Sequence, residues 1–127
     1  MKIPDINLNI LDVYKRSVVH YACRKNYFFS ITYLLDQNIN IEIMDHEENT
    51  PLAICLRYRN LDQAALIIKK GVKYGFVNDP TAEQKYRKMS YFAYAIKHFL
   101  VGICFMLIET GYPIQKALEE VTNEAFK

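Results

Sequence analysis

The chain has 127 residues, of which 51% are hydrophobic and 13% aromatic, so it can bury the core of one domain and is not a disordered chain. Its net charge of +2 is too small to indicate nucleic-acid binding by itself. The N-terminus lacks the apolar stretch of a secretion signal, and the longest apolar run, 99–108, is too short to span a bilayer.

The three cysteines, Cys23, Cys55 and Cys104, are odd in number and widely spaced. This pattern fits neither a disulfide framework nor a zinc-binding pair. We therefore expect free thiols that fill small core positions, and a cytoplasmic, reducing compartment as the corollary.

In chain order, the sequence repeats itself every 33 residues. Residues 5–11 match residues 38–44 position by position, so the chain opens with the tail of a repeat. Asp12 then returns as Asp45, and Ser17 as Thr50. A third copy follows after a short insertion, with Ser90, Leu107-Ile108 and Gly111 at the same relative spacing. A fixed period of this length predicts a solenoid, in which each unit buries its apolar face against its neighbours.

Each repeat is predicted to form two helices joined by a tight turn and followed by an extended loop. The hydroxyls of Ser17, Thr50 and Ser90 are placed to cap the first helix of each copy. Pro51 suits the first helical position, and Gly71 suits the end of a second helix because glycine tolerates positive φ. Glycine is missing from the turn between the two helices, where Asn26, Arg59 and Phe99 stand.

The segment Thr50-Pro51-Leu52-Ala53, with Asp45 before it and Ile67-Ile68 and Gly71 after it, resembles an ankyrin repeat. The resemblance implies an all-α ankyrin-repeat solenoid of stacked helix-turn-helix units with hairpin loops and a C-terminal capping helix. We expect one domain over 1–127, with the following parts: repeat tail 5–11, repeats at approximately 12–44, 45–77 and 85–114, an inserted hairpin finger 78–84, and a C-terminal helix 115–126. The resemblance also implies that His20 and Asp45 make hairpin hydrogen bonds.

Both ends of the predicted stack leave a question open. At the first repeat, Val18, Val19 and Tyr33 are expected to be exposed, because no helix pair precedes them in this sequence. Either a partner covers that edge or the chain belongs to a longer array. The C-terminal helix either caps the last repeat or docks on another chain.

The resemblance places a partner on the concave face, at the ends of the first helices and at the hairpin tips. Two residues stand at the end of each first helix, and the first of the two is basic in all three copies: Arg24, Arg57 and Lys97. The candidate partner-binding residues are Tyr14, Arg16, Arg24, Lys25, Arg57, Tyr58, Tyr86, Arg87, Lys97 and His98. Arginine can bind carboxylates in a fork and tyrosine supplies rigid contact area. The competing interpretation is that charged residues simply solvate helix ends and complement the helix dipole.

These observations favour a non-catalytic module or scaffold that binds another protein, through an acidic segment of that partner, as a component of a larger assembly. The alternative is a regulatory or substrate-recruiting segment of a larger protein that contains an enzyme. We find no phosphate-binding glycine loop, nucleophile motif or metal-ligand spacing. We therefore expect no catalytic residue, cofactor, metal, small-molecule substrate or membrane span, and the balanced charge disfavours nucleic acid.

Overall fold

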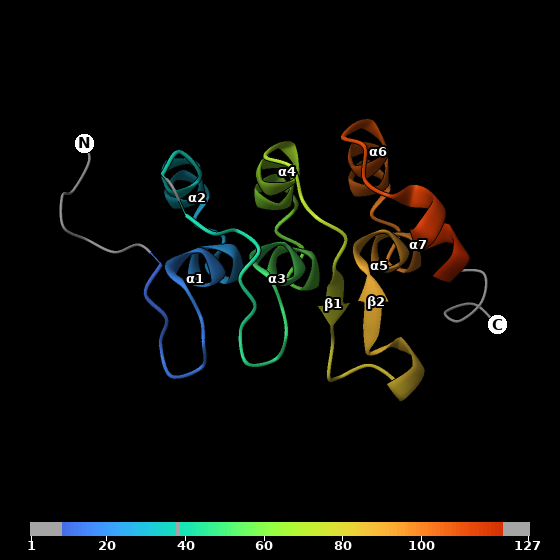
Figure 1. Cartoon of the computed structure of the whole chain (residues 1–127), viewed down its shortest axis with the longest axis horizontal. Coiled ribbons are helices and arrows are strands. Elements are labelled where there is room, and N and C mark those ends of the chain that lie inside the picture. Colours follow the sequence, from blue (N-terminus) through green and yellow to red (C-terminus); the bar gives the residue numbers. More distant parts are fainter. Residues whose placement is uncertain (1–8, 38, 121–127) are drawn as a thin grey trace.

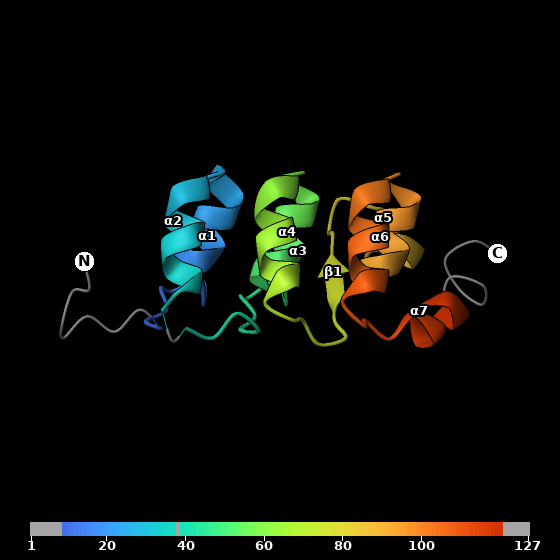
Figure 2. The same ribbon diagram turned by 90° about the horizontal axis from the view of Figure 1, so that it is seen from above.

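The computed structural model describes residues 9–37 and 39–120 as two parallel rows of helices stacked along one axis (Figure 1). One row holds the first helix of each pair: α1 (Val18–Lys25), α3 (Pro51–Arg57) and α5 (Tyr91–Lys97). The other row holds the second helices: α2 (Phe28–Leu35), α4 (Leu61–Lys69) and α6 (Val101–Glu109). Seen from above, the three pairs follow one another as separate layers (Figure 2). The predicted all-α solenoid is confirmed.

Hydroxyl caps fix the start of each first helix. The side chains of Ser17, Thr50 and Ser90 accept hydrogen bonds from backbone N–H groups three residues on, at 3.4, 3.3 and 3.1 Å. Pro51 occupies the first turn of α3, where its missing N–H leaves no partner unsatisfied. The predicted caps are therefore confirmed in all three copies.

The turns between paired helices require the left-handed backbone conformation. Asn26, Arg59 and Phe99 have φ values of 61°, 57° and 60°, although none of them is glycine. Asparagine tolerates this conformation better than residues with larger side chains do. Gly71, with φ of 90°, follows α4 as predicted.

The loops between pairs project as hairpins from the side of the first-helix row (Figure 1). Neighbouring hairpins are joined by hydrogen bonds, such as the one from the backbone N–H of His46 to the Tyr14 carbonyl at 2.9 Å. Asn49 accepts from the N–H of Asn78 at 2.7 Å and donates to the Asn78 carbonyl at 2.9 Å. The helices are thus supplemented by a second set of contacts that holds the repeats in register.

The third hairpin is longer and includes a small sheet. Strand β1 (Phe76–Asn78) pairs antiparallel with β2 (Lys88–Ser90), with Val77 opposite Met89. Residues 79–87 form the tip and include a 3₁₀ turn, η1 (Gln84–Tyr86). We call residues 79–87 the finger from here on; this range differs from the predicted 78–84 because Asn78 belongs to strand β1.

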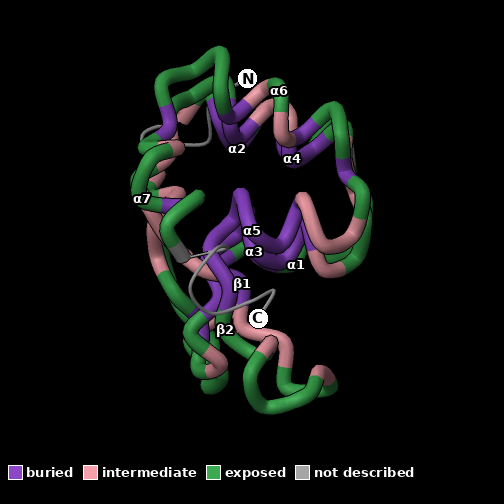
Figure 3. Tube along the Cα trace, turned by 90° about the vertical axis from the view of Figure 1, so that its right-hand side faces the viewer, coloured by how far each residue is buried: buried purple, intermediate pink, exposed green. Residues whose placement is uncertain are grey.

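The core lies where the two rows face each other and where successive pairs stack, as the buried segments in Figure 3 show. Val19 is 1% exposed, so the expectation that it lies on the open edge is wrong. It belongs to the core because α1 directs this side chain toward the rest of the stack, whereas its neighbour Val18 remains 44% exposed.

Helix α7 (Ile114–Glu120) packs against α5 and buries Ala117 completely. This contact supports the capping interpretation. The remainder of the helix predicted at 115–126 lies outside the described residues. Within the described part of the chain, no helix is long and apolar enough to cross a membrane.

Candidate partner-binding surface

The candidate surface begins at the ends of the first helices. Arg24 and Lys25 lie in the last turn of α1, Arg57 in that of α3, and Lys97 in that of α5. Stacking of the repeats therefore places one or two cations at the same end of each successive layer. Arg24 and Lys25 are exposed to solvent.

Tyr58 lies between the cations of the first two repeats. The guanidinium carbon of Arg24 is 5.5 Å from the centroid of the Tyr58 ring, and that of Arg57 is 5.7 Å away. Both distances are within the range of cation–π attraction. The ring, 43% exposed, thus connects two repeats and holds both cations near one face.

The Arg57 guanidinium is already paired with a carboxylate of this chain, that of Asp79 in the finger. The two side chains form an ion pair at 3.8 Å between Nη2 and Oδ1, and only 15% and 18% of their surfaces are exposed. Burial tends to raise the pKa of Asp79, but hydrogen bonds from Thr81 and the charge of Arg57 together lower it below its usual value. Arg57 is therefore a tethered member of this surface, and its carboxylate partner comes from the same chain.

The finger also meets the end of α5. The ammonium of Lys97 is 4.0 Å from the centroid of the Tyr86 ring, and that of Lys85 is 5.0 Å from it. Arg87 donates from Nε to the Ala82 carbonyl at 3.1 Å, which secures the finger internally. The finger thus adds an aromatic ring and cations to the surface.

His98 packs on Tyr94, with ring centroids 4.2 Å apart. Burial, followed by the nearby charge of Lys97, lowers the pKa of His98. The imidazole is therefore biased toward its neutral form, and its contribution to the surface is a ring with hydrogen-bonding nitrogens. The negative charge of Asp79 reaches both His98 and Arg57, so the contacts of the second and third repeats meet at this carboxylate.

Tyr14 and Arg16 form a separate group on the first hairpin. The Arg16 guanidinium lies 5.0 Å from the Tyr14 ring and 5.8 Å from the Tyr21 ring. Tyr21 donates a hydrogen bond to Asp12, whose other carboxylate oxygen accepts from the N–H groups of Tyr14 and Arg16. The hydrogen bond from Tyr21 is the main reason that the pKa of Asp12 is lowered.

His20 and Asp45 have the structural roles that the sequence predicts. His20 donates from Nε2 to the Asn49 carbonyl at 2.9 Å, while its Nδ1 accepts from the N–H of Ser17 at 3.0 Å. Burial lowers the pKa of His20, which favours the neutral ring that this arrangement needs. Asp45 accepts from the N–H groups of Glu47 and Asn49. Over residues 9–37 and 39–120, no group of three His, Cys, Asp or Glu residues could hold a metal ion.

Sequence reasoning placed the recurring basic residues on the first helices but missed Asp79, Lys85 and Tyr94. Asp79 stands in a stretch with evident turn chemistry, Asp79-Pro80-Thr81, which signals a loop. The direction in which a finger folds depends on tertiary contacts. No signal in the sequence pairs Asp79 with Arg57.

This arrangement defines a class of protein: a helix-pair repeat solenoid with projecting hairpins and a continuous stacked core. The family model for ankyrin repeats, in three copies, matches residues 2–78, which is more than half of the sequence. The chain belongs to the ankyrin-repeat family. Repeats of this family are generally protein-interaction modules.

Among solved structures, the chain is similar to a chain of the complex titled "Bd0816 Predatory Endopeptidase from Bdellovibrio bacteriovorus in complex with immunity protein Bd3460". The TM-score is 0.67 at 21% sequence identity, and the match covers 84% of this chain and 52% of that chain. This chain thus spans about half the length of the solved chain. At this identity the likeness shows the fold alone.

Proposed function

We propose that the chain is a non-catalytic scaffold or adaptor that binds an acidic segment of a partner protein. The binding surface is the set of cations and tyrosines at the ends of α1, α3 and α5, extended by the finger and, on the first hairpin, by Tyr14 and Arg16. We name the residues Arg24, Lys25, Arg57, Tyr58, Tyr86, Arg87, Lys97 and His98 the basic stripe. The observation that carries the proposal is the repeated contact between a cation and a tyrosine ring across successive repeats.

Preorganisation supports this function. A free lysine or arginine loses side-chain entropy when it binds, and here ring contacts already restrict Arg24, Arg57 and Lys97. The ion pair of Arg57 with Asp79 gives an example of a carboxylate bound at this surface. Arg24 and Lys25 remain exposed to receive further carboxylates. Because the helices fix the spacing between repeats, an extended acidic segment can contact several cations at once.

The test is charge reversal with a matched control. The variant Arg24→Glu/Lys25→Glu/Lys97→Glu changes the stripe, while Lys69→Glu/Lys70→Glu/Lys73→Glu makes the same change in charge at exposed positions at and after the end of α4. Each tagged chain is used for co-purification from native lysate treated with nuclease, and the recovered proteins are quantified by mass spectrometry. We expect a partner that the wild type and the α4 variant enrich and that the stripe variant loses by about tenfold or more.

Partners retained equally by the two variants would contradict the stripe as the binding surface. Loss of all enrichment after nuclease treatment would instead indicate nucleic acid as the ligand, and affinity would then fall steeply with salt. Urea unfolding of the variants checks that they remain folded.

A further inference from the structure

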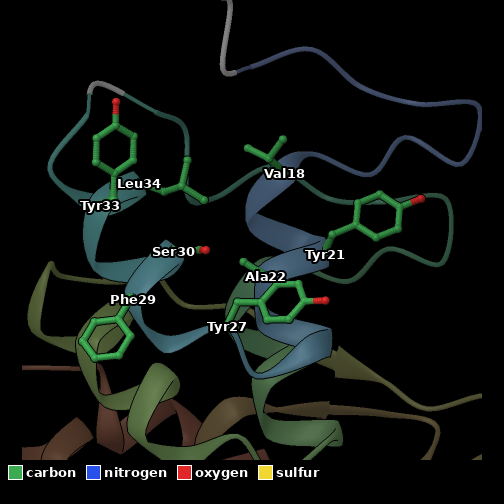
Figure 4. A pocket seen from close by; sticks show the side chains of 8 residues that line it. All are labelled: Val18, Tyr21, Ala22, Tyr27, Phe29, Ser30, Tyr33 and Leu34. Carbon is green, nitrogen blue, oxygen red and sulfur yellow. The ribbon is translucent and has the colours of Figure 1, made fainter. Parts of the chain in front are cut away.

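The open edge of the first helix pair carries an apolar groove that lies outside the basic stripe. The groove has a volume of about 530 Å³ and is lined by eight uncharged residues of α1, α2 and their turn (Figure 4): Val18, Tyr21, Ala22, Tyr27, Phe29, Ser30, Tyr33 and Leu34. Ala22 and Ser30 provide small side chains between the two helices, and larger aromatic side chains surround them. This edge is therefore a hollow with a narrow base and apolar walls.

The 33-residue spacing shows what covers the same positions inside the stack. Tyr21 corresponds to Ile54, and Ser30 corresponds to Gln63. Ile54 is 6% exposed and Gln63 is fully buried, whereas Tyr21 is 37% exposed and Ser30 lies in solvent. The difference has one cause: α1 and α2 pack against α3 and α4, and no described element packs on the open side of α1 and α2.

The occupant inside the stack is helical, since α1 packs on α3, α2 on α4 and α4 on α6. The covering helices present small and aliphatic side chains. Ile68 of α4 is fully buried, whereas its counterpart Ile108 on α6, after which no further helix pair is described, is 49% exposed. The interface that continues from the groove is therefore an interface between helices, with an aliphatic stripe on the incoming one.

The lack of charge at the groove also favours an apolar face on the incoming helix. None of the eight lining residues is charged, and the charged groups next to the groove, Asp12 and Arg16, already contact Tyr21, so an uncharged face fits the groove better than a charged one. Tyrosine and serine hydroxyls at the groove can bond to polar groups that flank the stripe of an incoming helix.

We propose that this groove binds an amphipathic α-helix of another chain. The incoming helix contacts the groove through a stripe of small and aliphatic side chains, as α2 packs on α4 inside the stack. The contact is distinct from the basic stripe and does not depend on it. Burial of apolar surface drives the binding, and specificity comes from the small residues at the base of the groove, which admit a helix only at close approach.

The probe is a helix of this same chain. A fluorescent peptide of residues 60–70, stapled across positions 62 and 69, presents the side of α4 that carries Ala64 and Ile68, which are both fully buried in the stack, where α4 also packs on α6. Both stapled positions are exposed in the protein, so the staple leaves that side free. Fluorescence anisotropy then measures binding to the full chain, and an Ile68→Asp peptide serves as its control.

One substitution inside the groove and one outside it give a matched pair of protein variants. Ser30→Arg fills the base of the groove, at a position that corresponds to buried Gln63. Phe99→Asp removes a comparably apolar side chain, 85% exposed, from the turn between α5 and α6, where it does not line the groove. We expect saturable binding to the wild type, a loss of about tenfold or more in Ser30→Arg, and a change within about twofold in Phe99→Asp.

Several results would overturn the proposal. These are no saturable binding, binding that Ser30→Arg leaves intact, or an equal loss in Phe99→Asp, which would indicate unspecific adhesion to exposed apolar side chains. A dimer of the chain that Ser30→Arg dissociates would also overturn it, because the occupant would be a second copy of the groove. Sedimentation of the three proteins without peptide tests this, and their unfolding midpoints verify folding. The stripe variant should bind the probe like the wild type, so failure of one proposal leaves the other standing.

Discussion

The second helix pair and the first have the same design but different surroundings. In α3, every residue from Pro51 to Leu56 is buried, because α1 packs against this helix on one side and strand β1 on the other. In α1, the positions that correspond to Pro51 and Ile54 carry the exposed side chains of Val18 and Tyr21. The local sequence makes a helix pair in both places, and only the number of neighbours separates a core from an open edge. In a stack, burial is thus a property of position along the array.

The largest expected effect is the loss of stability when a core side chain is shortened, and it should differ between the two pairs. Ile67→Ala in the second pair should reduce the free energy of unfolding by about 3–4 kcal/mol, because the side chain is fully buried and its cavity cannot collapse. The corresponding Leu34→Ala should cost about 2 kcal/mol, since Leu34 borders the open groove. Urea unfolding of both variants makes the comparison. Equal losses would show that the open edge is as tightly packed as the centre.

An intermediate effect comes from His20, which connects the first pair to the next hairpin and whose counterparts are Ala53 and Ala93. His20→Ala should cost about 2 kcal/mol at pH 7.5, because it leaves the buried Asn49 carbonyl and the Ser17 N–H without this partner.

This contribution should depend on pH. The pKa of His20 is lower in the folded protein than its ordinary 6.5, so the unfolded chain binds the proton more readily. The stabilisation is complete above about pH 6.5 and is lost as the pH falls through that value toward the folded pKa. The gap between wild type and His20→Ala should therefore narrow on acidification. A gap that is constant from pH 7.5 to pH 5 would contradict a neutral buried ring.

The smallest effect concerns the inter-helix turns and has the opposite sign. Arg59→Gly in the second pair should raise the free energy of unfolding by about 0.5–1 kcal/mol, because glycine relieves the left-handed conformation. Asn26→Gly in the first pair should change it by less, since asparagine already tolerates that conformation. Thermal unfolding of the two variants suffices. A destabilised Arg59→Gly would mean that the arginine side chain contributes more than the strained backbone costs.

Much of the architecture could be predicted from the chain itself. The capping hydroxyls, Pro51 and Gly71 act through contacts within a few residues, so their positions in the sequence identify the starts and ends of helices. His20 and Asp45 were also predictable, because the resemblance to the repeat assigns them a hairpin partner at a fixed spacing.

The candidate surface was predictable only in part. The recurring cations of the first helices follow from the repeat, but the choice between a binding surface and a solvated helix end does not. Val19 was misplaced because one residue along a helix turns a side chain by about 100° around the axis, from the open edge into the core. The ion pair between Arg57 and Asp79 joins residues far apart in the sequence, so no local pattern predicts it.

The sequence by itself determined the repeat period, the helix pairs and the cations that recur at the helix ends, because each depends on short-range geometry. The tertiary structure decided which faces are covered, where the finger lies and which cations remain exposed. These properties depend on how elements distant in the sequence pack against one another, which local patterns do not specify. The open groove on α1 and α2 belongs to this second kind, since its residues resemble a core and only the absence of a described neighbour on that side makes them a surface.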